Sequence, residues 1–88
     1  MSTKGFAVPE VIPFELLAEN QCGQIVEIIG PSVWQQRLEE LGLRTGKEIR
    51  LVRRGEPCIV GIDDQRISLR IQSDTMILVE VDSASPRS

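Results

Sequence analysis

The 88-residue sequence contains no histidine and no tyrosine, and aromatic residues make up only 3% of it. Without histidine, no serine–histidine or cysteine–histidine catalytic pair can form, and the usual acid–base group near neutral pH is missing. One Trp and two Phe are too few to stack single-stranded nucleic acid or to line a polyproline groove. The composition therefore favours a protein that is not an enzyme.

Cysteine is also scarce, because only Cys22 and Cys58 are present. Their density is far below that of a disulfide-stapled secreted domain, and neither belongs to a C-x-x-C pair of the kind found in zinc sites. We expect reduced thiols in a cytoplasmic protein without a cofactor or metal site. A peripheral ferrous or zinc contact of Cys58 with Glu56 is left open. No apolar run approaches the ~20 residues of a membrane helix, so we expect no direct membrane insertion.

The net charge of −3 argues against nucleic acid as the main partner, since phosphate binding needs a strongly positive surface. Five of the ten basic residues nevertheless fall within residues 44–54. The strand period places Arg50 and Arg54 on one face and Arg53 on the other, the face of the apolar residues. A solvated surface balanced by nearby acids is one interpretation of this segment. The alternative is a positive patch, extended by Arg66 and Arg70, that binds an acidic protein surface.

The segment over residues 32–43 predicts a short helix with a signal at each end. Ser32 and Gln35 have the spacing of a capping box, which satisfies backbone N–H groups at a helix start. Gly42 is suited to the left-handed conformation that ends a helix, with Leu43 making the accompanying apolar contact. We expect the helix over about residues 33–41, with its apolar stripe (Trp34, Leu38 and Leu41) plugging one end of a barrel.

Five short strands are predicted around this helix, over residues 24–29, 48–54, 58–62, 66–71 and 76–81. The first is β-branched on both faces, which predicts burial on both sides. Short, closely spaced strands predict a mainly β fold, a small antiparallel barrel of about five strands. Residues 1–13 are expected to be a flexible N-terminal extension, residues 14–81 the domain, and residues 82–88 a flexible C-terminal tail.

The order of motifs resembles the FeoA family, the small cytoplasmic proteins that accompany the ferrous iron transporter FeoB. The resemblance centres on R-L-x-x-L-G-L-x-x-G over residues 37–46, followed by G-E-P over residues 55–57 and I-S-L-R over residues 67–70. One departure is visible: family members often carry P-x-G-D-P in the loop, where this chain has R-R-G-E-P over residues 53–57. The surface before the turn is therefore more basic.

The resemblance implies an SH3-like barrel that is not an enzyme and acts by protein–protein contact. Its expected partner is FeoB, at the cytoplasmic face of the inner membrane, whose GTPase or transport cycle it could modulate. The alternative is a stand-alone metal-sensing or regulatory domain, related to the C-terminal domains of metal-dependent repressors. An exposed barrel strand could also pair weakly with a second copy.

Two surfaces are the candidates for partner binding. One is the outward face of the helix, opposite its apolar stripe, and the other is the basic group on and after the second strand. Their members are Gln36, Glu39 and Glu40 on the helix and Arg50, Arg53 and Arg54 in the basic group.

Overall fold

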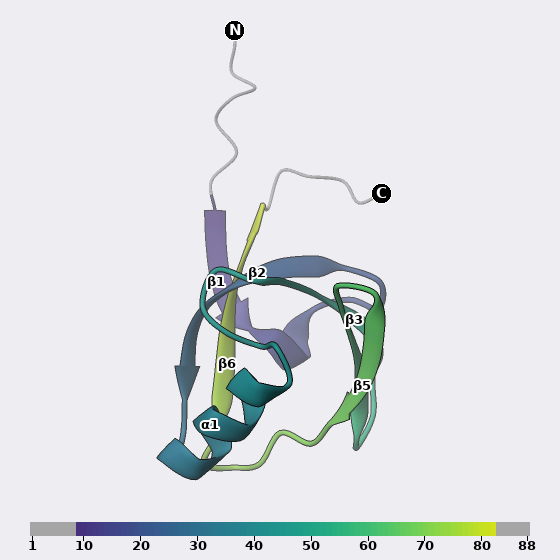
Figure 1. Ribbon diagram of the computed structural model, residues 1–88. Coiled ribbons are helices and arrows are strands. Elements are labelled where there is room, and N and C mark those ends of the chain that lie inside the picture. The colour runs from purple at the N-terminus through teal and green to yellow at the C-terminus, as the bar shows by residue number, and fades with distance from the viewer. Residues whose placement is uncertain (1–8, 83–88) are drawn as a thin grey trace, which may run out of the picture.

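The computed structural model describes residues 9–82, which form one six-stranded antiparallel sheet, a single α-helix and one turn of 3₁₀ helix (Figure 1). The strand order across the sheet is β1-β6-β2-β3-β4-β5. The elements are β1 (Pro9–Pro13), η2 (Phe14–Leu16), β2 (Cys22–Ile29), α1 (Ser32–Glu40), β3 (Glu48–Arg53), β4 (Cys58–Ile62), β5 (Gln65–Leu69) and β6 (Met76–Asp82).

The mainly β prediction with one short helix is confirmed, but the sheet has six strands rather than five. The additional strand is Pro9–Pro13, which was predicted to belong to a flexible extension and instead pairs with β6 along its whole length. Both prolines lie at the ends of an edge strand, where a missing N–H is tolerated. The described domain therefore runs from residue 9 to residue 82. Residues 1–8 and 83–88 lie outside the described residues.

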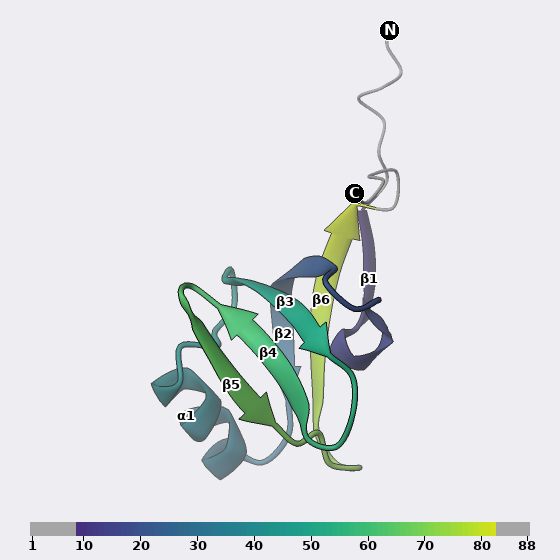
Figure 2. The ribbon, with the colours of Figure 1, turned by 90° about the vertical axis from the view of Figure 1, so that its right-hand side faces the viewer.

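The sheet curls around its core, and α1 lies at the lower end of the curl in Figures 1 and 2. The strands that line the curl alternate between buried and solvent-facing residues. In β4, for example, Cys58, Val60 and Ile62 are buried whereas Ile59 and Gly61 are half-buried. This alternation separates an inner apolar face from an outer face that is open to solvent.

Strand β2 departs from the sequence prediction because only one of its faces is buried. Gly23 and Ile25 face the core, whereas Ile28 is half-buried and Ile29 is exposed. The register with β6 shifts between Ile25 and Glu27, so a bulge interrupts the period-two pattern in the middle of the strand. The run of β-branched residues therefore reflects strand propensity rather than burial on both sides.

Nearly every element contributes at least one large apolar side chain to the core. Phe14 and Leu17 enter it from the turn around η2, and Leu38 is the one α1 residue that is fully buried. Each fully buried Leu, Ile or Phe contributes about 1.5–3 kcal/mol relative to an exposed side chain. The largest buried side chains are Phe14, Leu17, Ile25, Leu38, Leu43, Ile49, Leu51, Ile77, Val60 and Val79.

Of the two predicted helix-end signals, the one at the start is wrong and the one at the end is confirmed. Ser32 is the first helical residue, Pro31 occupies the N-cap, and no side chain caps the helix start, so the predicted capping box is wrong. Gln35 donates instead to the carbonyl oxygen of Gly30, at 2.8 Å. At the other end, the predicted glycine stop is confirmed, because Gly42 has φ of 97° and its N–H donates to the carbonyl of Glu39.

The apolar stripe of α1 is only partly buried. Leu38 has 1% of its surface exposed and Trp34 packs against the core, but Leu41 remains 39% exposed. The reason is the glycine stop itself: the chain turns after Leu41, and Leu43 enters the core instead with its N–H bonded to the carbonyl of Leu38. The helix thus covers one end of the curl through Trp34 and Leu38.

Candidate partner-binding surface

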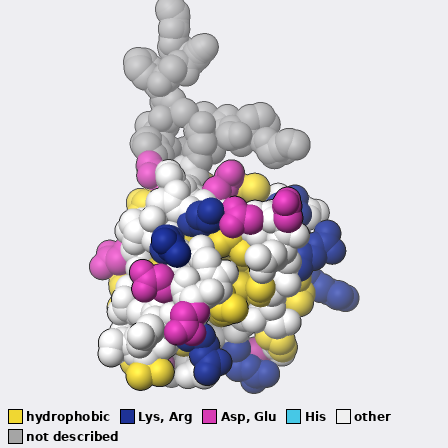
Figure 3. Space-filling view, viewed as in Figure 1, with side chains coloured by type: hydrophobic (Ala, Val, Ile, Leu, Met, Phe, Trp, Pro, Cys, Tyr) yellow, Lys and Arg dark blue, Asp and Glu magenta, His cyan; other side chains and the backbone are white. Residues whose placement is uncertain are grey.

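The helix surface predicted for partner binding is solvent-exposed as expected. Gln36, Glu39 and Glu40 are all exposed on α1, on the side away from the buried Leu38. Figure 3 shows that acidic and basic side chains are interspersed over the face that carries α1. This face therefore presents mixed charges rather than a field of one sign.

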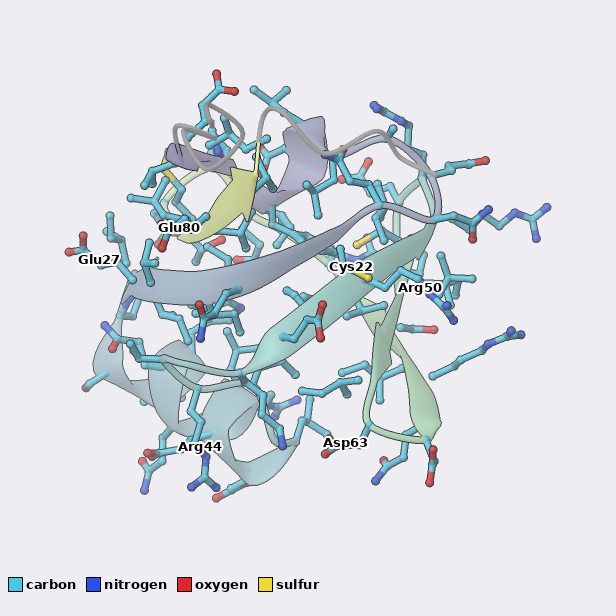
Figure 4. The ribbon with its side chains drawn as sticks, turned by 90° about the horizontal axis from the view of Figure 1, so that it is seen from above. Cys22, Glu27, Arg44, Arg50, Asp63 and Glu80 are labelled. Carbon is cyan, nitrogen blue, oxygen red and sulfur yellow. The ribbon has the colours of Figure 1, made fainter. Side chains whose placement is uncertain are left out.

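The basic group does not form one cluster, because each of its three arginines meets different neighbours. Arg50 lies on the outer face of β3, where its register partners are Cys22 on β2 and Gly61 on β4. Gly61 in turn pairs with Arg66 on β5. Four residues from four adjacent strands thus form one row across the outer face. Figure 4 shows Cys22 and Arg50 next to each other in this row.

The guanidinium of Arg50 lies over Gly61. A Cβ atom placed on Gly61 would come within 3.6 Å of both Nε and Nη2 of Arg50 and within 3.2 Å of Cγ2 of Val52. Because Gly61 has no side chain, the Arg50 guanidinium can lie over the backbone of β4, the strand that separates it from Arg66 on β5. We refer to Arg50, Gly61 and Arg66 as the Gly61 notch.

A second row, nearer the β4–β5 turn, carries the acids. Glu48 is two residues before Arg50 on the same face of β3, and Asp63 and Asp64 form the turn. Asp63 forms an ion pair with Lys47, with an Nζ–Oδ1 distance of 3.0 Å. It is the only ion pair within 4.0 Å in the part of the chain that the structure describes. Arg50 and Arg66 therefore have no carboxylate partner among these residues.

The two rows line one open hollow of about 600 Å³. Its lining is mostly polar and spans β2 to β5, with positive groups in one row and carboxylates in the next. The residues that line it are Cys22, Gly46, Lys47, Glu48, Ile49, Arg50, Gly61, Asp63, Asp64, Gln65 and Arg66.

The strand period predicted that Arg53 shares a face with Ile49 and Leu51, and this prediction is wrong. The register between β3 and β4 shifts between Leu51 and Arg53, which opposes Ile59. This irregularity takes Arg53 out of the alternation, and its side chain is exposed while Ile49 and Leu51 are each 1% exposed. Arg53 is thus available to solvent for a reason that the sequence pattern did not contain.

Arg54 is committed to bonds within the chain. Its Nη2 donates to the carbonyl oxygen of Leu17 at 2.8 Å, and its backbone N–H donates to Oε2 of Glu19 at 3.0 Å. The nearby N–H of Leu51 donates to the carbonyl of Gln21. Arg54 therefore fastens the end of β3 to the turn after η2, which gives it a structural role.

The two cysteines lie in different surroundings. The thiol of Cys58 is buried and donates to the carbonyl oxygen of Leu69 at 3.2 Å, and burial raises its pKa. Cys22 is exposed, but desolvation and the charge of Glu48 raise its pKa as well. Over residues 9–82, no three His, Cys, Asp or Glu side chains come together as a metal site would require. The open alternative of a Cys58–Glu56 contact gains no support from this geometry.

The sequence signalled part of this surface. It identified Arg50, and named Arg66 as an outward residue that could extend the patch, but it did not place the two in one row across Gly61. A glycine within a strand signals close approach of another group or a bulge, and here the group is the Arg50 side chain. Which of the row's arginines face each other depends on strand register, which a single sequence does not give.

Three comparisons with known proteins bear on this fold. The model of the FeoA domain family matches residues 12–81. A crystal structure of an iron uptake regulatory protein (FeoA), solved by sulfur SAD, aligns with a TM-score of 0.72 and 22% identity, covering 82% of this chain and 99% of that one. No curated protein sequence gave a significant match.

The structural match shows a shared fold, and the family model shows the family. Within residues 9–82, no helix is long and apolar enough to cross a membrane. The family motif over residues 37–46 corresponds to the second half of α1, its glycine stop and the turn that leads to β3. Because the family model covers most of the domain, from the end of β1 to β6, the chain belongs to the FeoA domain family.

Proposed function

We propose that this chain is a non-catalytic accessory protein of ferrous iron uptake, which binds the cytoplasmic part of a FeoB-type transporter. Membership of the FeoA domain family, from residue 12 to residue 81, is the observation that carries the proposal. The family is an accessory one, and the chain's lack of histidine agrees with a role in contact rather than catalysis. The protein would then work in the cytoplasm, held at the inner membrane by its partner.

The surface chemistry supports contact with a protein. The exposed residues of α1 and the rows across β2 to β5 offer both signs of charge, and the hollow that these rows line is mostly polar. Charged rims of this type steer and orient a partner more than they add affinity. Binding that only tethers the transporter and binding that also changes GTP hydrolysis by its G domain are distinguished by the rate of hydrolysis.

The test is co-purification of the tagged chain from detergent-solubilised, iron-starved cells that contain the transporter. We expect the transporter to be recovered with the tagged chain and not with the tag alone. GTP hydrolysis by its G domain is then measured with and without the chain. Absence of the transporter from the eluate would overturn the proposal. Calorimetric titration with ferrous iron separates the metal-sensing alternative, which requires stoichiometric binding that is lost in Cys58→Ser.

A further inference from the structure

We propose that the Gly61 notch receives a carboxylate side chain from the protein partner, held between the guanidinium groups of Arg50 and Arg66. The inference rests on the proposed function, since it names the part of the chain that the partner contacts. It selects the outer face of β3, β4 and β5 over the helix surface. It also leaves Arg54 out of the contact, because Arg54 is bonded to Leu17.

The spacing suits one carboxylate group. Arg50 and Arg66 lie on strands separated by β4, so their backbones are roughly 10 Å apart. Both side chains are exposed, and because Gly61 carries no side chain, the Arg50 guanidinium extends over β4, the strand that lies between it and Arg66. Guanidinium groups bind carboxylates through paired, charge-assisted hydrogen bonds. A Glu or Asp side chain entering from above can therefore reach both arginines.

The charges of the notch are unpaired within the described chain. The nearest acid along β3 is Glu48, two residues from Arg50, which places their Cα atoms roughly 7 Å apart. Asp63 is already paired with Lys47. A partner carboxylate would thus supply a counter-charge that the chain itself does not provide.

The acidic row argues for a protein side chain rather than a phosphate-rich ligand. Glu48 and Asp64 line the same hollow as the notch, next to Lys47 and Asp63, which neutralise each other. A polyphosphate would bring several negative charges close to these two carboxylates and be repelled. A protein segment can place an acid in the notch and a neutral or basic residue beside Glu48 and Asp64, so charge complementarity favours it.

Two substitutions test the notch by different means. Arg66→Glu reverses one of its charges, and Gly61→Ala places a methyl group under Arg50 without changing any charge. The added Cβ lies 3.2 Å from Cγ2 of Val52, which must give by a few tenths of an ångström, and 3.6 Å from the Arg50 guanidinium, which is ordinary van der Waals contact. Arg44→Glu is the matched control, because Arg44 is also exposed and Figure 4 shows it on the side of α1, away from Arg50.

Cys22 provides a built-in reporter of the contact. It is the register partner of Arg50 and is exposed, whereas Cys58 is buried, so alkylation of the folded chain should report on Cys22 alone. A partner seated in the notch would cover Cys22 and slow its reaction with N-ethylmaleimide. Cys58 would stay unreactive in both states.

The experiment measures binding of the full chain and its variants to the purified transporter, with circular dichroism and urea unfolding as checks of the fold. We expect Arg66→Glu to weaken binding about tenfold or more, Gly61→Ala to weaken it about threefold, and Arg44→Glu to change it less than about threefold. Cys22 alkylation should slow in the wild-type complex.

The outcomes separate the two proposals. If the wild-type chain does not bind the transporter, the proposed function fails and this inference fails with it. If the wild-type chain binds but Arg66→Glu and Arg44→Glu bind alike, or Cys22 reacts equally fast in the complex, the inference alone is overturned. Protection of Cys22 by millimolar inorganic phosphate without the transporter would also overturn it, as would protection that follows only self-association of the chain.

Discussion

The two cysteines differ in ways that alkylation can measure at the level of single residues. Cys22 is exposed and Cys58 is buried with its thiol bonded to Leu69, so one thiol should react in the folded protein and the second only after unfolding. Because desolvation and Glu48 raise the pKa of Cys22 from 9.0, its reaction should stay slow at pH 7 and accelerate above pH 9. The measurement is the rate of N-ethylmaleimide incorporation against pH.

Glu48→Gln provides the control for that pH profile. Removing a nearby negative charge stabilises the thiolate, so the pKa of Cys22 should fall and its alkylation at pH 8 should speed up. Desolvation remains in the variant, and the profile should therefore shift only in part. A profile identical to that of the wild type would show that Glu48 does not act on this thiol. Two reactive thiols in the folded chain would contradict the burial of Cys58.

Residue-level prediction from the sequence worked where the strand period held. Ile49 and Leu51 lie on the face opposite Arg50, as the strand period predicted, and in the structure that face is buried whereas Arg50 is exposed. It failed at Arg53, because a register shift in the sheet interrupts the alternation. It also did not predict the bond from Arg54 to Leu17, which lies far away in the sequence. Both features arise from pairing between distant segments, which a local pattern does not encode.

At the scale of the helix, the two ends of α1 predict opposite responses to alanine. Ser32→Ala should change the free energy of unfolding by less than about 0.5 kcal/mol, because Ser32 makes no capping bond. Gly42→Ala should destabilise by about 1 kcal/mol or more, because Gly42 has φ of 97°. Among the described residues, the one atom within 4 Å of the new Cβ is Cδ1 of Ile62 at 3.8 Å, so this effect is backbone strain. Urea unfolding of both variants measures the difference.

A loss of about 1 kcal/mol in Ser32→Ala would restore the predicted capping box and contradict the helix start described here. The C-terminal signal was predictable because it lies within a few residues: Gly42 bonds to Glu39 and Leu43 to Leu38. The N-terminal signal was ambiguous, since a Gly-Pro pair precedes Ser32. Pro31 takes the N-cap and shifts the helix start by one residue, which leaves Ser32 without a capping role.

For the whole molecule, the sequence predicted the order of elements from β2 to β6 but missed β1. Proline at both ends and the lack of a clear period made Pro9–Pro13 look like an extension. What makes this segment a strand is β6, almost seventy residues later, which offers it a free edge. The pairing places Ile12 against the core. Contacts so distant in sequence can be seen only once the sheet is assembled.

Removal of residues 1–13 should therefore destabilise the domain and promote self-association. The truncation deletes β1 and the packing of Ile12, and it turns β6, an interior strand of apolar residues, into an open edge. We expect a lower urea midpoint and a concentration-dependent mass in light scattering. Val11→Ala is the control, because Val11 is 53% exposed and its loss should leave both properties unchanged. A truncated chain that stays monomeric with the wild-type midpoint would show that β1 contributes nothing to the sheet, as expected of a flexible extension.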